Sequence, residues 1–224
     1  ALERPELTTR ANAAYYRWAL PRGVRHARRV VVPSGHVRDR LTACLGLSPA
    51  RVRVIPLGVG RAFRPLPRPD VERTLQAFRR IVPEEQPFFL CVGNVERKKN
   101  LGTVVEAFGR LEGKCRSSAL VLAGRAGPEY RTLRERVRRS GLEGRVHFTG
   151  YAPPELLVAL YNAATAVLHP SLEEGFGLPP LEAMACGTPA VTSNAGALPE
   201  VVGGAGILLP ATTSGRAPAF EVTA

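Results

Sequence analysis

Residues 169–187 read HPSLEEGFGLPPLEAMACG, and this stretch decides the fold. The short apolar run before it, residues 165–168, predicts a buried strand. After the glycines, Pro179 and Pro180 suit the first turn of a helix, where a missing N–H costs nothing. That helix is expected to end at Gly187. The stretch therefore predicts a strand, a loop and a helix in succession.

The loop has the properties of a phosphate site. Gly175 and Gly177 flank Phe176, so the backbone can approach a ligand without a side chain in the way. The free N–H groups around Gly177 and Leu178 lie at the positive end of the predicted helix, which attracts anions.

Two carboxylates bracket this predicted anion site, Glu174 in the loop and Glu182 one turn into the helix. Carboxylates accept hydrogen bonds from sugar hydroxyls, so the pattern suits a ligand with both phosphate and hydroxyl groups. A purely structural interpretation also exists, in which Glu182 interacts with the helix dipole and Glu174 caps the loop.

The whole string resembles the nucleotide-sugar signature of retaining glycosyltransferases of the GT-B fold, of the group 1 or family 4 type. That family is related to bacterial mannosyl- and glucosyltransferases and to glycogen and sucrose synthases. Its two glutamates stand eight positions apart around a GFG-like turn, as Glu174 and Glu182 do here. The resemblance implies the Rossmann-like C-terminal half of a GT-B fold, with a remnant of the first domain before it.

Composition sets broad limits. The chain has 224 residues, enough for one large domain or two small ones. No apolar run approaches the ~20 residues that a membrane span needs, and no signal-peptide pattern opens the sequence. The four cysteines are scattered, which predicts neither a metal site nor a disulfide framework and favours the cytoplasm. Cys91 and Cys186 are expected in the core.

The net charge of +12 is concentrated near the N-terminus. Residues 1–64 hold thirteen arginines against three acidic residues, a balance of +10, which leaves +2 for the rest of the chain. A helix predicted over 9–20 adds Tyr15, Tyr16 and Trp18 to this charge. Such a segment can lie on an anionic membrane surface, or it can pack its aromatic side chains inward.

Three segments are predicted along the chain. Residues 1–64 are expected to form the end of an N-terminal, acceptor-side domain and the hinge, with a helix that Pro21 ends. Residues 65–210 are expected to form the nucleotide-sugar-binding domain, and residues 211–224 a disordered tail. Since the family continues on both sides of this region, the chain is expected to be a fragment or a truncated product.

From residue 69 onward, predicted strands alternate with helices, which is typical of an α/β, doubly wound parallel sheet. The strands are expected at 88–92, 119–123, 146–149, 166–168, 190–192 and 207–209, and the helices at 71–81, 101–111, 129–140, 154–164 and 198–202. Ligands of such sheets bind outside the carboxyl ends of the strands. This rule brings four loops to one edge: Gly93 to Asn100, Gly124-Arg125, Gly150-Tyr151 and His169 to Gly177.

The second candidate site is CVGNVERKKN, residues 91–100. Arg97, Lys98 and Lys99 crowd the start of the next predicted helix, where cations are unfavourable unless a polyanion offsets them. A solvated run of charges is the plain alternative. The resemblance implies that Lys99 holds the diphosphate. Many members carry Arg directly after Gly93, where this chain has Asn94, so Arg97 or Lys98 is the expected second cation.

As the resemblance implies, Glu174 and Lys99 are the catalytic candidates. Glu174 would hold the donor sugar, Glu182 the ribose, and the turn at Gly175, Phe176, Gly177 and Leu178 the phosphates. Further substrate-binding candidates on the same edge are Gly93, Asn94, Gly124, Arg125 and Tyr151. No metal and no cofactor is expected, because the chain holds only two aspartates and no D-x-D motif. A histidine at the end of a strand more often has a structural than a catalytic role, so a structural role is expected for His169.

These patterns predict a hexosyltransferase that uses a GDP- or UDP-type sugar donor and a glycan or lipid-linked acceptor. It would lie in the cytoplasm, with a peripheral contact to an anionic membrane. Two other classes stay open: a sugar-nucleotide epimerase of the same fold, and a truncated product that binds nucleotide without turnover. Nucleic acid is not an expected partner, because the charge carries no recognised motif.

Overall fold

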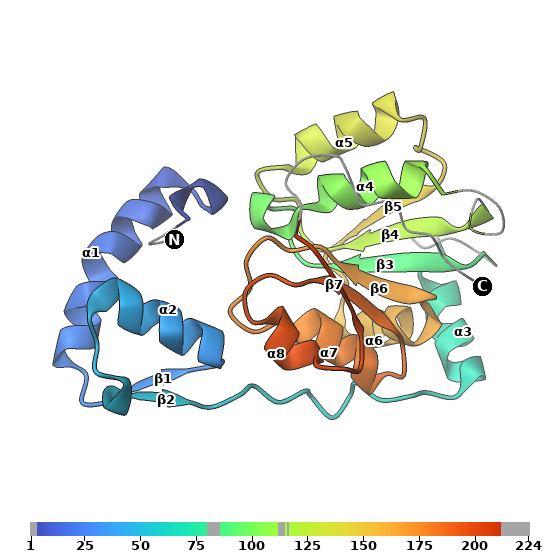
Figure 1. Ribbon diagram of the computed structural model, residues 1–224. Helices are drawn as coiled ribbons and strands as arrows, with labels where there is room; N and C mark the ends of the chain where they lie inside the picture. Colours follow the sequence, from blue (N-terminus) through green and yellow to red (C-terminus); the bar gives the residue numbers. More distant parts are fainter. Residues whose placement is uncertain (1–3, 80–85, 112–114, 116, 212–224) are drawn as a thin grey trace.

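The computed structural model describes residues 4–79, 86–111, 115 and 117–211, which form a small N-terminal unit and a larger α/β unit joined by an extended linker (Figure 1). In the N-terminal unit, helices α1 and α2 pack on the parallel strands β1 and β2. The bounds are α1 Arg10–His26, β1 Val30–Val32, α2 Gly35–Leu45 and β2 Val52–Val54. Val32, Leu47 and Val52 form its small core.

The larger unit contains a six-stranded parallel sheet in the order β5-β4-β3-β6-β7-β8. Its strands are β3 Phe88–Val92, β4 Ala119–Ala123, β5 Val146–Gly150, β6 Ala166–His169, β7 Ala190–Ser193 and β8 Ile207–Leu209. The chain leaves β3 to build one half of the sheet and returns to β6 to build the other. The switch point between β3 and β6 is where doubly wound sheets bind ligands. This arrangement confirms the predicted fold class.

Helices cover both faces of the sheet, as Figure 1 shows. One face packs against α4 and α5, and the other against α3, α6 and α7. These helices are α3 Arg68–Ala77, α4 Leu101–Gly109, α5 Tyr130–Arg139, α6 Pro154–Ala163 and α7 Leu178–Ala185, followed by α8 Leu198–Val202. Cys91 and Cys186 are buried in these two cores, as expected, and the four cysteines are free.

The predicted bounds of two helices were wrong. Helix α1 runs through Pro21 to His26, because a proline removes one hydrogen bond of the ladder and the turns on both sides still form. The helix expected over 71–81 begins earlier, at Arg68, where Pro67 and Pro69 suit its first positions, and it ends at Ala77. Residues 80 and 81 of that prediction, and residues 212–224 of the predicted tail, lie outside the described residues.

Candidate functional site

Two loops meet at the switch point: the basic loop (residues 93–100), which follows β3, and the signature loop (residues 170–177), which follows β6. The Lys99 Nζ lies 2.5 Å from Glu174 Oε1. The Leu172 amide donates to the Lys98 carbonyl at 2.8 Å, and Asn100 Nδ2 donates to the Pro170 carbonyl at 3.3 Å. The carboxyl-edge rule therefore brought together the two loops that the sequence had singled out.

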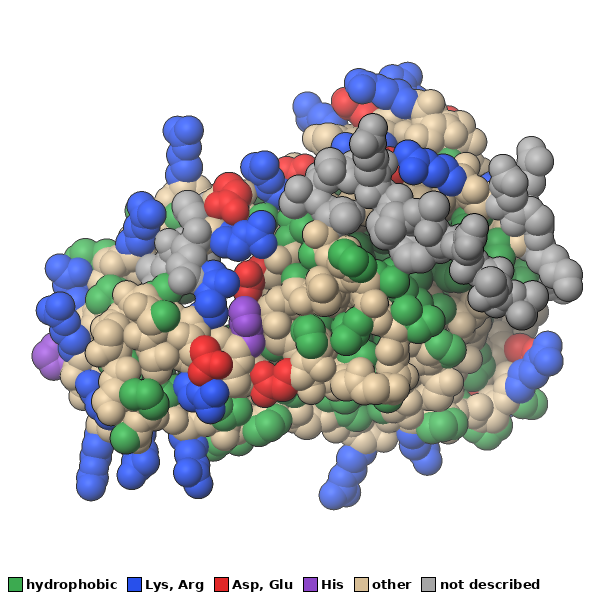
Figure 2. All heavy atoms as spheres, viewed as in Figure 1, with side chains coloured by type: hydrophobic (Ala, Val, Ile, Leu, Met, Phe, Trp, Pro, Cys, Tyr) green, Lys and Arg blue, Asp and Glu red, His purple; other side chains and the backbone are tan. Residues whose placement is uncertain are grey.

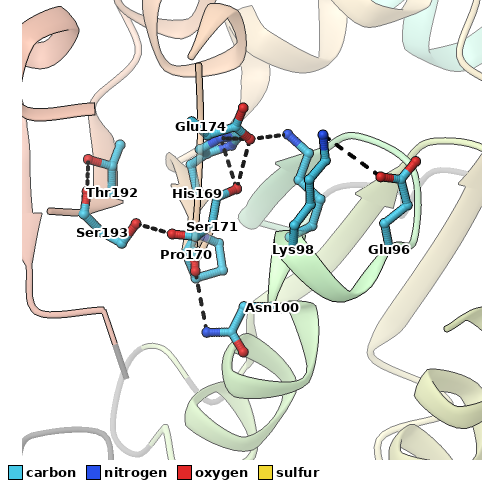
Figure 3. Close-up of polar contacts among 10 residues, drawn as sticks. Glu96, Lys98, Asn100, His169, Pro170, Ser171, Glu174, Thr192 and Ser193 are labelled. Atoms are coloured by element: carbon cyan, nitrogen blue, oxygen red, sulfur yellow. Dashed lines mark hydrogen bonds and ion pairs between the residues drawn. The ribbon is translucent and has the colours of Figure 1, made fainter. Parts of the chain in front are cut away.

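Glu174 is the centre of the polar contacts in Figure 3, where His169 and Ser171 point toward its carboxylate. His169 Nε2 lies 3.2 Å from Glu174 Oε1, and Ser171 Oγ donates to the same oxygen at 3.0 Å. Burial disfavours the charged carboxylate, but the hydrogen bond from His169 and the charge of Lys99 outweigh it and lower the pKa of Glu174. The site thus holds an ionised carboxylate beside an ammonium group.

His169 is buried, and this burial together with the nearby Lys99 charge lowers its pKa, although Glu174 acts in the opposite direction. The ring is therefore neutral near pH 7. Because an ionised carboxylate only accepts hydrogen bonds, the Nε2 of His169 carries the proton in the contact with Glu174. A structural role was expected for this histidine, and in the structure His169 orients the Glu174 carboxylate.

Helix α7 begins directly after the signature loop, and its N-cap is Gly177. Gly177 has φ 112°, a backbone conformation that favours glycine, and a Cβ there would come within 2.7 Å of Leu198 Cδ2, so the Leu198 side chain would also have to shift. No side chain caps this helix end. Pro179 and Pro180 lack N–H groups, which leaves the amides of Gly177 and Leu178 as the donors that face the loop.

Glu182 lies one turn further along α7, and its Oε2 accepts a hydrogen bond from Tyr161 Oη at 2.8 Å. Burial raises the pKa of Glu182, and the bond from Tyr161 partly offsets this effect. The structure places Glu182 beside α6 rather than in the Lys99–Glu174 contact. The two predicted glutamates therefore occupy neighbouring places on the same loop-and-helix segment and have different partners.

Backbone hydrogen bonds connect the loops that carry other predicted site residues at the carboxyl edge of the sheet. Gly93 N donates to Ala123 O, and Gly124 N donates to Gly150 O, each at 2.9 Å. A Cβ on Gly124 would lie 2.0 Å from the Gly93 carbonyl oxygen, so this position needs glycine for close approach. The Arg125 guanidinium lies 5.1 Å from the centre of the Tyr151 ring, which is 61% exposed. This exposed pair offers a flat cationic and aromatic surface at the end of β4 and β5.

Three residues of the basic loop lie apart from the Lys99–Glu174 contact. Asn94 Nδ2 donates to Glu96 Oε1 at 3.3 Å, and Lys98 Nζ lies 3.9 Å from Glu96 Oε2 (Figure 3). Arg97 borders a cavity of 240 Å³, and neither Lys99 nor Glu174 borders that cavity. The charge of Lys98 acts on His169, which contacts Glu174, so Lys98 rather than Arg97 is the better candidate for the second cation.

The N-terminal unit touches the signature loop through the first turn of α2. Ser34 Oγ donates to the Gly175 carbonyl at 2.7 Å, and His36 Nε2 lies 2.9 Å from Glu173 Oε1. The amides of Gly35 and His36 donate to the carboxylate of Glu200, which lies in the first turn of α8. Both sequence neighbours of Glu174 are therefore held by a segment about 140 positions earlier in the chain.

The sequence interpretation missed several of these residues. Ser171 and Ser193 form a chain of hydrogen bonds, in which Ser193 Oγ donates to the Ser171 carbonyl at 2.5 Å and Ser171 donates to Glu174. Gly196 has φ 63°, and a Cβ there would lie 2.4 Å from the Glu174 carbonyl oxygen. A serine two positions before Glu173 and a glycine inside a turn were visible in the sequence, but neither pattern indicated which residue would be its partner.

Within the described residues, no three His, Cys, Asp or Glu side chains come together as metal ligands. In the same part of the chain, no helix is both long and apolar enough to cross a bilayer.

Two family models match the sequence. The model described as glycosyl transferases group 1 covers residues 72–214, and the model described as Glycosyltransferase Family 4 covers residues 2–63. O-antigen chain mannosyltransferase B of Escherichia coli is 44% identical over 124 residues, which is 55% of this chain and 32% of that protein. The 2-deoxystreptamine N-acetyl-D-glucosaminyltransferase of Streptomyces fradiae is 33% identical over 198 residues, 88% of this chain and 45% of that protein. The chain thus spans less than half the length of these two relatives.

Solved structures share the fold over nearly the whole chain. Sucrose-phosphate synthase from Thermosynechococcus elongatus has a TM-score of 0.77 at 27% identity, covering 93% of this chain and 52% of that chain. Anabaena Alr3699/HepE, solved in complex with UDP and glucose, has a TM-score of 0.79 at 24% identity, covering 95% of this chain and 56% of that chain. At 24% identity, the similarity to the Anabaena protein is a similarity of fold alone.

Proposed function

Since this chain belongs to the glycosyl transferases group 1 family, we propose that it binds a nucleoside-diphosphate sugar and contributes to the transfer of the hexose, with retention, to a glycan or lipid-linked acceptor. The observation that carries this proposal is the contact of Lys99 with Glu174 at the switch point of the sheet. It joins a cation for phosphate to a carboxylate for hydroxyl groups, beside an uncapped helix end.

The diphosphate would lie between Lys99 and the amides of Gly177 and Leu178. Negative charge develops on this group as the bond to the sugar breaks, and preorganised donors and cations stabilise such a leaving group. The Lys99 ammonium is held on a buried stem with an exposed fraction of 13%, so it is already ordered before a ligand arrives. Lys98 is the proposed second cation.

Glu174 would accept hydrogen bonds from the hydroxyl groups of the donor sugar, and Glu182 from those of the ribose. Because His169 and Ser171 hold the Glu174 carboxylate, its orientation costs little when the sugar binds. Arg125 and Tyr151 would contact the base, since an exposed ring and a guanidinium plane both stack on nucleobases.

The donor is proposed to be a GDP- or UDP-hexose. One relative is named a mannosyltransferase, and one structure of similar fold was solved with UDP and glucose. We further propose that residues 1–64 end an acceptor-side domain and that residues 65–210 form the donor domain. The exposed aromatic and basic residues of α1 support a peripheral contact with an anionic membrane.

The test is calorimetric binding of UDP, GDP and ADP to the chain and to three variants. Lys99→Ala should weaken binding of the preferred nucleotide by about 2 kcal/mol or more, which is about thirtyfold in Kd. Glu174→Gln should bind the bare diphosphate at least as well as the parent, because it removes the carboxylate that competes for Lys99. Arg139→Ala removes one exposed charge from α5 and serves as the control.

If Lys99→Ala binds all three nucleotides as the parent chain does, the proposed phosphate site is wrong. An equal loss in Arg139→Ala would show that the effect is general charge attraction rather than a site. If no nucleotide binds the parent chain, the proposed donor-binding function of this chain is refuted.

A further inference from the structure

Tyr161 connects helix α6 with helix α7 and with the linker. It lies on α6 with no exposed surface, and its hydroxyl donates to Glu182 Oε2 on α7 at 2.8 Å. Side chains on a helix lean toward its N-terminus, and α6 begins at the carboxyl edge of the sheet. The hydroxyl of Tyr161 is therefore carried toward the edge where the basic loop and the signature loop meet.

The hydroxyl is not needed to fill the core. A phenylalanine would bury nearly the same ring without requiring a polar partner, whereas a buried tyrosine needs one. Burial raises the pKa of Tyr161, so the group stays protonated and donates. The hydrogen bond occupies Oε2 of Glu182 and fixes the plane of the carboxylate, and Oε1 is the oxygen that would accept from a ligand hydroxyl.

The same residue also contacts the linker between the two units. The Phe63 ring packs edge-on against Tyr161, with 5.7 Å between ring centres and 74° between planes. The next residue, Asn162, accepts from the Leu66 amide at 2.8 Å and donates to the Arg64 carbonyl at 3.1 Å. The linker thus contacts two adjacent residues near the end of α6, Tyr161 and Asn162. Of these two, Tyr161 is also the hydrogen-bond partner of Glu182.

From these contacts we infer that Tyr161 is a positioning residue for the donor: it orients Glu182 for the ribose hydroxyls, and Phe63 of the linker supports its ring. The inference rests on the proposed role of Glu182 in nucleotide binding. It adds a residue that touches no ligand and acts only through the carboxylate that it holds.

A purely structural role for Tyr161 predicts a different pattern of effects. If the hydroxyl only stabilised the packing of α6 on α7, its removal would affect every ligand of the domain alike. If it acts through Glu182, its removal affects ligands that contain ribose and spares ligands that lack it. Inorganic pyrophosphate contains the phosphate groups without the ribose, so it separates the two roles.

The experiment measures Kd by calorimetry for the preferred nucleoside diphosphate and for inorganic pyrophosphate. The proteins are the parent chain, Tyr161→Phe, Glu182→Ala, the double variant and Tyr130→Phe. Tyr130 is the matched control, because its ring also packs edge-on against a phenylalanine, Phe148, at 5.4 Å. Thermal unfolding of each variant establishes that the compared proteins are folded.

Tyr161→Phe should weaken nucleotide binding by about three- to tenfold, the range of an ordinary net hydrogen bond, because the lost bond orients Glu182 and does not itself touch the ligand. Pyrophosphate affinity should not change. In the Glu182→Ala background, Tyr161→Phe should add no further loss, because the partner through which it acts is gone. Tyr130→Phe should bind both ligands as the parent does.

The outcomes separate this inference from the function on which it rests. If Glu182→Ala binds nucleotide normally, the proposed ribose contact is wrong, and the role of Tyr161 is refuted with it. If Glu182→Ala weakens binding and Tyr161→Phe does not, only the positioning role is refuted. An equal loss for pyrophosphate, or an additive loss in the double variant, would show that Tyr161 is structural.

Discussion

At the scale of single residues, Glu174 combines burial with charge. Two neutral donors and one cation surround a carboxylate whose side chain is 13% exposed. Removing one partner of such a buried ion pair leaves the other charge buried and unpaired. The free-energy cost of that unpaired charge exceeds the net stabilisation that the intact pair provides. We therefore expect that, under the proposed function, a ligand phosphate replaces the Glu174 carboxylate beside Lys99, while His169 and Ser171 still donate hydrogen bonds to Glu174.

The pKa shifts at this site predict a dependence of stability on pH. Burial lowers the pKa of His169 below its usual 6.5, and it also lowers the pKa of His147. The unfolded chain then binds protons that the folded chain does not, so the free energy of unfolding should fall as the pH drops through 6.5 toward 5. Denaturant titrations at several pH values measure this slope.

His169→Gln should flatten that slope, and His26→Gln, at an exposed position on α1, should leave it unchanged. Glu174 adds a separate loss in stronger acid, below its ordinary pKa of 4.5, because its own pKa is lowered in the folded chain. A slope that is the same in the parent and in His169→Gln would contradict a neutral, buried His169.

At this scale the sequence predicted which two loops would meet, but not the individual contacts that join them to the rest of the molecule. The carboxyl-edge rule placed Lys99 and Glu174 in neighbouring loops, because it depends only on strand direction. It could not predict that Ser34 would donate to Gly175 or that Glu200 would accept from Gly35, since these partners are 141 and 165 positions apart. Long-range pairing of polar groups depends on packing, and packing leaves no periodic signal in the sequence.

At the scale of elements, the strands were predicted closely and the helix ends less so. The apolar run 119–123 has the same bounds as β4, because a strand that is buried on both faces must be apolar throughout. The continuation of α1 through Pro21 was not predicted, because an exposed helix that buries only Ala13 has little periodic pattern to outweigh the usual effect of proline.

The close approach of β3 and β4 gives a prediction at this scale. Gly124→Ala should destabilise the chain by about 3 kcal/mol, because the new Cβ would meet the Gly93 carbonyl, a backbone group that cannot rotate away. Gly144→Ala is the matched control, since a Cβ there meets nothing within 4 Å. Urea denaturation compares the two, and equal midpoints would show that the strand ends can separate at little cost.

The distribution of charge belongs to the scale of the whole molecule. Figure 2 shows Lys and Arg side chains projecting around the N-terminal unit and again over α5. The two surfaces differ in their aromatic content. On α1, Tyr15 and Trp18 are each 60% exposed, so they do not pack inward as one interpretation of the sequence allowed. An exposed aromatic beside arginines suits a membrane surface better than arginines alone.

The chain should therefore sediment with vesicles that contain phosphatidylserine and should be released at high salt. Replacing Tyr15 and Trp18 by serine should reduce the bound fraction, because the rings insert at the headgroup level. Replacing Arg138 and Arg139 of α5 by glutamate should leave it nearly unchanged. If the α5 variant loses binding and the α1 variant keeps it, the membrane contact lies on the other basic surface.

The docking of α2 on the signature loop also has a kinetic consequence. The amide hydrogens of Gly35 and His36 are bonded to Glu200, a residue of the other unit, and they can exchange with solvent deuterium only when that bond opens. Separation of the two units breaks both bonds together with the one from Ser34 to Gly175. The rate of deuterium uptake at these two amides therefore measures how often the two units of the molecule separate.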